Sequence, residues 1–353
     1  MPPSILQRKT TSSIALLTAI VGFSTLLTGP AQAHGTDEDR LPRGCSGTGP
    51  IICHFDVPPG HYNVTALLGG RSAGSTSISA ETRRTMLAET PTAAGRLALR
   101  SFTVNVRDPE GQPTGAAGSP GLDLRFEGSA PELAWLAVTP AHHARRLLLA
   151  GDSTVCDQST VPFTGWGQEI PQLLNRGISV ANYADSGEST QTFLDNPALF
   201  DALEPQIRRG DIVLIQLAHN DKSTTAEDYR RNLTTMAERV RGKFGEPVFV
   251  TPIVRRRFNR DGTLNDTALH VMAANLPVEM RSLAKELDVP LVDLTAMTER
   301  LVEELGPDAS RDLYLTNING DNTHTSQYGA ATFAKLVLDD LEAQEIIPSR
   351  YIR

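Results

Sequence analysis

The stretch Leu147-Leu148-Leu149-Ala150-Gly151-Asp152-Ser153 decides how the second half of this chain is interpreted. Four consecutive apolar residues bounded by a glycine predict a strand that is buried on both faces. Four further apolar runs follow, at residues 178–182, 212–217, 247–251 and 290–293. Helical patterns lie between and after them, near residues 167–174, 192–204, 226–241, 269–287 and 326–341. This alternation predicts an α/β domain with a doubly wound, five-stranded parallel sheet.

For this sheet we predict the flavodoxin-like strand order 2-1-3-4-5. The residues that follow its strands are candidates for the functional site. In such sheets the ligand lies at the carboxyl ends of the strands. Ser153 follows the first strand, Gly187 the second, and Asn220 the third. Asp321 and His324 come just before the last helical pattern. These five residues are therefore expected to share one edge of the sheet.

Their chemistry suits nucleophilic acyl transfer. The Ser153 hydroxyl needs a base, and His324 is the natural one near neutral pH. Asp321 would hold the imidazole in the correct tautomer. A tetrahedral oxyanion needs fixed donors, which the backbone N–H groups of Ser153 and Gly187 and the amide of Asn220 can supply. Asp152 is expected to organise the turn through local hydrogen bonds.

These residues resemble the four sequence blocks of the GDSL-type (SGNH) hydrolases. The likeness extends to the rhamnogalacturonan acetylesterase branch of that family. It is carried by Gly151 to Val155, Gly165 to Gln168, Thr251 to Phe258 and Asp321 to Ser326. Residues 80–84 and 102–107 resemble the N-terminal sandwich of bacterial members. The resemblance implies a metal-independent hydrolase that removes acetyl groups from pectin backbones, with no cofactor.

The chain departs from the family pattern at two positions. Ala218 stands where the third block usually has glycine, and Glu188 where an arginine often follows the glycine of the second block. Glu188 reverses a charge near the expected site, which leaves the substrate open. An esterase for acetylated xylan or lipid would share the same catalytic residues. A non-catalytic carbohydrate-binding protein is the alternative outside enzymes, although binding alone needs no base aligned on a serine.

Three residues are candidates for substrate binding. Arg255 and Arg257 belong to an arginine run after the fourth strand, where guanidinium groups could pair with galacturonate carboxylates. Ion pairing with neighbouring acids is the equal alternative. Trp166 could stack on a sugar ring, and core packing is equally compatible with a single aromatic residue.

The first 33 residues predict a secretory signal peptide. Arg8 and Lys9 precede an apolar stretch from Ile14 to Leu27, which is shorter than the ~20 residues that span a bilayer. Ala31-Gln32-Ala33 is a small-residue cleavage motif. We therefore expect a secreted protein without a membrane segment after cleavage, divided into a signal peptide at 1–33, a β-sandwich domain at 34–144 and a catalytic domain at 145–353.

The β-sandwich prediction rests on short strand-like segments separated by turn clusters. They lie at residues 61–68, 75–81, 97–107, 122–126 and 133–138. Gly70-Arg71-Ser72-Ala73-Gly74 has the pattern of a nucleophile elbow, but a strand rather than a helix follows it, so we expect a hairpin loop. Cys45 and Cys53 are expected to form a disulfide, and Cys156 to be a buried packing residue rather than a reactive thiol.

Composition excludes some classes of protein. The 353 residues carry a net charge of −8, which disfavours nucleic-acid binding because phosphate neutralisation needs a cationic face. The eight histidines form no His-Glu-x-x-His pattern, so we expect no metal. The expected partner is an acetylated polysaccharide. For the β-rich half we favour a role in bracing the catalytic domain over glycan binding.

Overall fold

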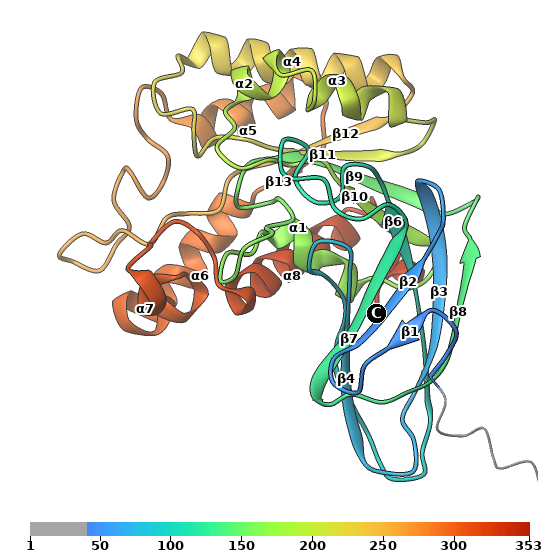
Figure 1. The fold of residues 1–353 in the computed structure, drawn as a ribbon. Coiled ribbons are helices and arrows are strands. Elements are labelled where there is room, and N and C mark those ends of the chain that lie inside the picture. Colours follow the sequence, from blue (N-terminus) through green and yellow to red (C-terminus); the bar gives the residue numbers. More distant parts are fainter. Residues whose placement is uncertain (1–40) are drawn as a thin grey trace, which may run out of the picture. The chain divides into compact units, whose positions relative to one another are not determined.

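A five-stranded parallel sheet organises the second half of the chain in the computed structural model, which describes residues 41–353 (Figure 1). Its strand order is β10-β9-β11-β12-β13, and every pair is parallel. This confirms the predicted order 2-1-3-4-5. The strands are β9 (Arg145–Gly151), β10 (Ile178–Asn182), β11 (Ile212–Gln216), β12 (Glu246–Val250) and β13 (Leu291–Val292).

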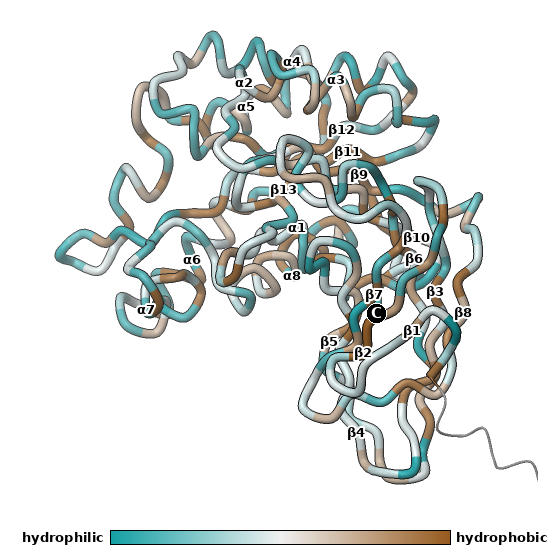
Figure 2. The backbone as a smooth tube through the Cα atoms, in the orientation of Figure 1, coloured by the Kyte–Doolittle hydropathy of each residue, from teal (hydrophilic) through white to brown (hydrophobic). Residues whose placement is uncertain are grey.

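Helices cover both faces of this sheet, because its strands are apolar on both sides. Leu147 and Leu149 of β9 pack into one apolar core, and Leu148 and Ala150 pack into the other. The first core lies against α1 (Trp166–Glu169), α6 (Leu294–Ala309) and α8 (Gln327–Ala343). The second lies against α2 (Thr190–Asp195), α3 (Phe200–Leu203), α4 (Ala226–Gly242) and α5 (Leu276–Leu287). Figure 2 shows the apolar residues gathered along these strands.

Several helices differ from the sequence prediction at their ends. The segment expected at 192–204 splits into α2 and α3, because Asn196-Pro197 cannot continue a helix. The segment expected at 269–287 is helical only from Leu276, where Asn275 caps the helix and accepts a hydrogen bond from the Val278 N–H group. The helix α6 was not predicted. Short turns of helix complete this half: η2 (Ile170–Leu173), η3 (Glu204–Gln206), η4 (Ser310–Leu313), α7 (Thr316–Asn319) and η5 (Ser349–Tyr351).

The first half forms two antiparallel sheets, which confirms the expected sandwich. One sheet has the order β1-β2-β7-β4-β5 and the other β6-β3-β8. A single apolar core that includes Val64, Phe102 and Phe126 lies between them. The strands are β1 (Cys45–Ser46), β2 (Ile51–Phe55), β3 (Gly60–Leu68), β4 (Gly74–Ala80), β5 (Arg84–Thr92), β6 (Ala98–Val106), β7 (Leu122–Ala130) and β8 (Leu133–Pro140).

Two local predictions in this half can be checked directly. Cys45 and Cys53 are joined by a disulfide across the paired strands β1 and β2. Residues 70–73 form a loop that leads directly into β4, which begins at Gly74, as expected for a segment that is no nucleophile elbow. It is not a hairpin, however, because β3 and β4 belong to different sheets.

Residues 41–353 form one compact unit. The predicted boundary at residue 145 coincides with the start of β9, and the division into two domains stays a prediction. The predicted signal peptide lies outside the described residues. Within residues 41–353, no helix is both long and apolar enough to cross a membrane.

Candidate active site

The turn after β9 presents Ser153 at the carboxyl edge of the parallel sheet. Asp152 organises this turn, because its Oδ1 accepts hydrogen bonds from the backbone N–H and the hydroxyl of Thr154, at 2.9 and 2.8 Å. Gly151 is needed for the close packing, since a Cβ there would lie 2.6 Å from the Cγ2 atom of Val155. Burial raises the pKa of Asp152 to about 6. Asp152 therefore has the structural role that its local position predicts.

Ser153, His324 and Asp321 form one chain of hydrogen bonds. The Oγ atom of Ser153 lies 3.0 Å from Nε2 of His324, and Nδ1 of His324 lies 2.7 Å from Oδ2 of Asp321. His324 and Asp321 belong to the turn before α8, and Ser326 caps that helix by accepting a hydrogen bond from the Gly329 N–H group. This arrangement matches the nucleophile, base and orienting carboxylate of acyl transfer.

The second oxygen of Asp321 is also held. Its Oδ1 accepts hydrogen bonds from the backbone N–H groups of Thr323 and His324, at 2.7 and 3.1 Å. Partial burial raises the pKa of Asp321, but the hydrogen bonds from His324 and from the two backbone groups outweigh it, so the pKa is lowered overall. Asp321 therefore stays ionised and is fixed in orientation.

Two of the three predicted oxyanion donors, Gly187 and Asn220, lie on loops that are tied together. The Asn220 amide donates to the Glu188 carbonyl oxygen at 3.0 Å. The buried Asp221, next to Asn220, accepts hydrogen bonds from the backbone N–H and the hydroxyl of Thr190, three residues after Gly187. Gly187 has a φ of +86°, a conformation that favours glycine. Within the described residues, no hydrogen-bond acceptor is paired with the N–H of Ser153 or of Gly187.

The arginine run divides into residues with different roles. Arg255 is 7 % exposed, and its guanidinium donates to the Thr323 hydroxyl at 2.9 Å and to the His219 carbonyl at 2.8 Å. It therefore links the loop of His324 to the loop of Asn220, which corrects the prediction that it binds substrate. Arg256 donates to Asn322 and Ser310. Arg257 is exposed, so a substrate contact stays a prediction for it alone.

Trp166 is a core residue, and its prediction as a sugar-stacking platform is wrong. The side chain is 1 % exposed and packs in the apolar core beneath the site. Its Nε1 donates to Oε1 of Gln216 at 2.8 Å, and Gln216 in turn donates to the Thr154 hydroxyl. A ring closed in on its faces cannot stack on a sugar.

Two contacts on Ser153 and His324 were missed by sequence reasoning. The amide of Gln158 donates to the Ser153 carbonyl oxygen at 2.8 Å. The ring of Phe163 meets the His324 ring edge-on, with centroids 5.3 Å apart. Both belong to the loop after the nucleophile, and Arg83 from the antiparallel half donates to the carbonyl oxygens of these same two residues. No local pattern marks such a contact.

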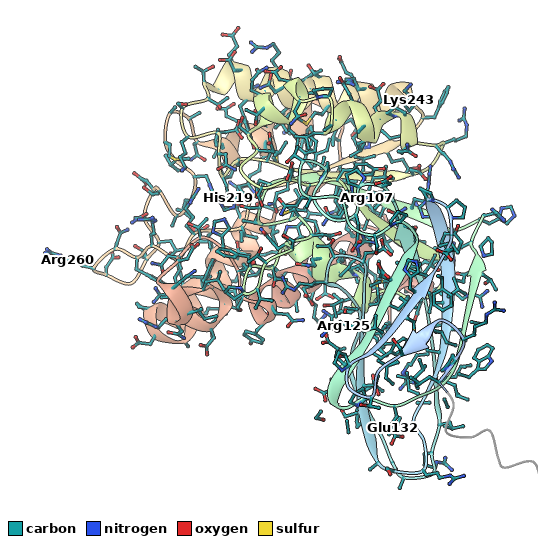
Figure 3. The ribbon with its side chains drawn as sticks, viewed as in Figure 1. Arg107, Arg125, Glu132, His219, Lys243 and Arg260 are labelled. Atoms are coloured by element: carbon teal, nitrogen blue, oxygen red, sulfur yellow. A yellow bond between two sulfur atoms is a disulfide. The ribbon has the colours of Figure 1, made fainter. Side chains whose placement is uncertain are left out.

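The neighbouring buried groups are neutral packing residues. Burial lowers the pKa of His219, labelled in Figure 3, well below its ordinary value. Its ring packs edge-on against that of His270. Burial raises the pKa of the Cys156 thiol, so it carries no reactive thiolate. Ala218 is fully buried in the core. Among residues 41–353, no cluster of three His, Cys, Asp or Glu side chains could hold a metal ion.

Comparison with known proteins identifies the family of this chain. The sequence model of the GDSL-like Lipase/Acylhydrolase family matches residues 149–332, which include Ser153, Asp321 and His324. The chain is 39 % identical over 213 residues to the rhamnogalacturonan acetylesterase RhgT of Bacillus subtilis (strain 168). That alignment covers 56 % of this chain and 89 % of RhgT.

A second relative extends into the antiparallel half. The chain is 27 % identical over 303 residues to the uncharacterized esterase YxiM of the same bacterium, covering 83 % of this chain and 74 % of YxiM. The crystal structure of the YxiM protein shares the fold, with a TM-score of 0.54, 24 % identity, and coverage of 84 % of this chain and 81 % of that one. The chain belongs to the GDSL-like Lipase/Acylhydrolase family and is a carboxylic ester hydrolase.

Proposed function

We propose that this enzyme removes O-acetyl groups from rhamnogalacturonan, with Ser153 as nucleophile, His324 as general base and Asp321 as the residue that orients it. The similarity to RhgT supports the substrate. The observation that carries the mechanism is the continuous chain of hydrogen bonds, 3.0 Å from Ser153 to His324 and 2.7 Å from His324 to Asp321.

The proposed reaction has two acyl-transfer steps. His324 takes the proton of the Ser153 hydroxyl as its oxygen attacks the acetyl carbonyl carbon. The negative charge on the carbonyl oxygen is stabilised by the N–H groups of Ser153 and Gly187 and by the Asn220 amide. The bond between the acetyl carbon and the sugar oxygen then breaks as His324 protonates that oxygen, so the sugar departs with a free hydroxyl and acetyl-Ser153 remains. Water, activated by His324, releases acetate and restores the serine.

A serine variant tests the mechanism. We expect Ser153→Ala to lower kcat by about 10⁶-fold, the loss typical of removing such a nucleophile, because no other group can form the acyl-enzyme. The fold should stay intact, since only one small side-chain atom is removed. Acetate release from acetylated rhamnogalacturonan and cleavage of p-nitrophenyl acetate measure the two activities, with circular dichroism as the folding control.

The two assays separate the substrate from the mechanism. Cleavage of p-nitrophenyl acetate without acetate release from rhamnogalacturonan, both by the wild type, would redirect the assignment to acetylated xylan or another ester. Full activity in the folded Ser153→Ala protein would contradict the nucleophile.

We also propose that the enzyme is secreted, on the pattern of a charged start, an apolar stretch and a cleavage motif ending at Ala33. Export by a bacterial host should yield a protein whose first residue is His34. Sequencing the N-terminus of protein from the culture medium measures this, and retention of the intact chain inside the cells would contradict it.

A further inference from the structure

A large cleft separates the β5 edge of the antiparallel half from α8 and the loop that contacts His324. Its volume is about 810 Å³, within the ~300–1,000 Å³ range of ligand-binding pockets. One wall is made by β4, β5 and β7, and the other by η2, the N-terminal turn of α8 and the segment around Val161. Figure 3 labels Arg125, which lines the wall on β7. The match to the family covers residues 149–332, so one wall lies outside it.

The lining combines apolar surface with uncharged hydrogen-bonding groups. Tyr328 is 66 % exposed and Val161 is 70 % exposed, although side chains of this kind are usually covered. The uncharged polar residues along the walls are Ser77, Ser79, Thr85, Gln172 and Gln327. A sugar ring presents both an apolar face of C–H groups and an edge of hydroxyl groups. The tyrosine ring suits the first, and the hydroxyl and amide groups suit the second.

Charges in the cleft are largely balanced. Arg125 lies 2.5 Å from Glu127, with which it forms an exposed ion pair. Glu169 is buried, and its carboxyl group accepts a hydrogen bond from the Thr85 hydroxyl at 2.9 Å. Arg83 also lines the cleft, and its guanidinium donates to the carbonyl oxygens of Gln158 and Phe163. Both arginines of the lining already have acceptors, so we expect the hydroxyl groups and ring faces of the sugars to dominate recognition.

Two segments of the chain link the proposed catalytic residues to the lining of the cleft. The first includes Phe163, whose ring contacts His324, and reaches the cleft at Val161. The second runs from His324 to Gln327 and Tyr328, which also line it. The hydroxyl of Thr325 donates to the Thr164 carbonyl oxygen and so fastens the segments together.

We propose that this cleft is a second carbohydrate-binding site, which holds residues of the polysaccharide distant from the ester under attack. The proposal rests on the proposed function, since it assumes that the substrate is a polysaccharide. It also gives the antiparallel half a role in substrate binding, because Ser77, Ser79 and Arg125 come from that half.

Calorimetric titration of the folded Ser153→Ala protein with deacetylated rhamnogalacturonan oligosaccharides tests the site without turnover. Adding Tyr328→Ala should raise Kd by about 2- to 10-fold, which is the usual worth of one aromatic contact. Adding Ser77→Trp should raise it as well, because the indole fills the cleft. Trp135→Ala is the matched control, since Trp135 is 49 % exposed on β8 and does not line the cleft. We expect this control to leave Kd unchanged.

The outcomes separate this site from the proposed function. Equal Kd values in the Ser153→Ala protein and in both cleft variants, or no binding at all, would overturn the site even if the wild type releases acetate from the polymer. Conversely, binding that depends on Tyr328 without acetate release would support the site and overturn the proposed function. If the Trp135→Ala control weakens binding as much as the cleft variants do, the oligosaccharide binds non-specifically. That result would also overturn the proposed cleft site.

Discussion

Asp321 illustrates how much depends on the placement of one carboxylate. One of its oxygens accepts from Nδ1 of His324, and the other accepts from two backbone N–H groups. These contacts hold its pKa below the ordinary value despite partial burial. An ionised, immobile acceptor favours the tautomer in which Nδ1 carries the proton. In that tautomer Nε2 is free to accept the proton of Ser153.

Replacing this carboxylate by an amide should therefore be severe. We expect Asp321→Asn to lower kcat by about 10⁴-fold, because the amide permits the wrong imidazole tautomer. The rate of p-nitrophenyl acetate cleavage measures the effect. Asp339→Asn is a matched control on α8, since Asp339 is exposed and pairs with Lys335. A folded Asp321→Asn protein with wild-type kcat would contradict the proposed role of Asp321.

At the residue scale, the sequence predicted which side chains lie at the site better than it predicted which of them are exposed to solvent. Ser153, Asp321 and His324 could be placed together because strand ends in a parallel sheet meet at one edge. Trp166 and Arg255 were assigned to substrate binding because their chemistry suits sugars and carboxylates. Their burial depends on partners far along the chain, Gln216 for Trp166 and Thr323 for Arg255. Sequence neighbours hold no information about such contacts.

At the scale of elements, β5 supports the loop after the nucleophile. The guanidinium of Arg84, 1 % exposed, forms two hydrogen bonds with Oδ2 of Asp157, at 3.1 and 3.0 Å. The other carboxylate oxygen of Asp157 accepts from the Asn182 amide at the end of β10. Three segments from different parts of the chain, β5, the end of β10 and the loop after Ser153, therefore converge on one buried ion pair. Asp157 lies four residues after Ser153 in that loop.

Removing one partner of this pair should be costly. We expect Arg84→Ala to lower the free energy of unfolding by about 3–5 kcal/mol, because it leaves the Asp157 carboxylate buried without its counter-charge. Urea denaturation measures the change. Arg231→Ala on α4 is the control, since Arg231 forms an exposed pair with Asp228 that should contribute about 0–1 kcal/mol. Similar losses in the two variants would contradict the importance of burial.

Prediction of elements succeeded where the apolar pattern is strong. All five parallel strands and the helix α4 follow clear patterns, whereas β5 was missed because its sequence begins Arg84-Thr85 and contains Glu89. Its first two residues, Arg84 and Thr85, are buried against the α/β half, where they form hydrogen bonds with Asp157 and Glu169. The helix α6 was missed although residues 294–305 are periodic, because Gly306-Pro307 interrupts it.

For the molecule as a whole, Glu169 makes stability depend on pH. Burial raises the pKa of this carboxyl group from 4.5 to about 7 in the folded protein. Both the folded and unfolded states hold the proton below about pH 4.5, and its stabilising contribution is then complete. As the pH rises toward 7, the unfolded state releases the proton first, so this contribution is lost.

Glu169→Gln should remove this dependence. Between about pH 5 and pH 8, we expect the free energy of unfolding of the wild type to fall relative to that of Glu169→Gln, by up to about 3 kcal/mol. Urea denaturation at several pH values measures the difference between the two proteins. Glu238→Gln, at an exposed position on α4, controls for the loss of one charge. Parallel curves for wild type and Glu169→Gln would refute the assignment.

The contacts of Arg83 and Arg84 also bear on how such enzymes can be recombined. These adjacent arginines in the antiparallel half hold the carbonyl oxygens of Gln158 and Phe163 and the carboxylate of Asp157. The β-rich half therefore cannot be exchanged for another module without losing these contacts. A chimera that grafts another β-rich module onto this hydrolase would have to transplant the arginine pair together with residues 157–163, or redesign both sides of the junction at once.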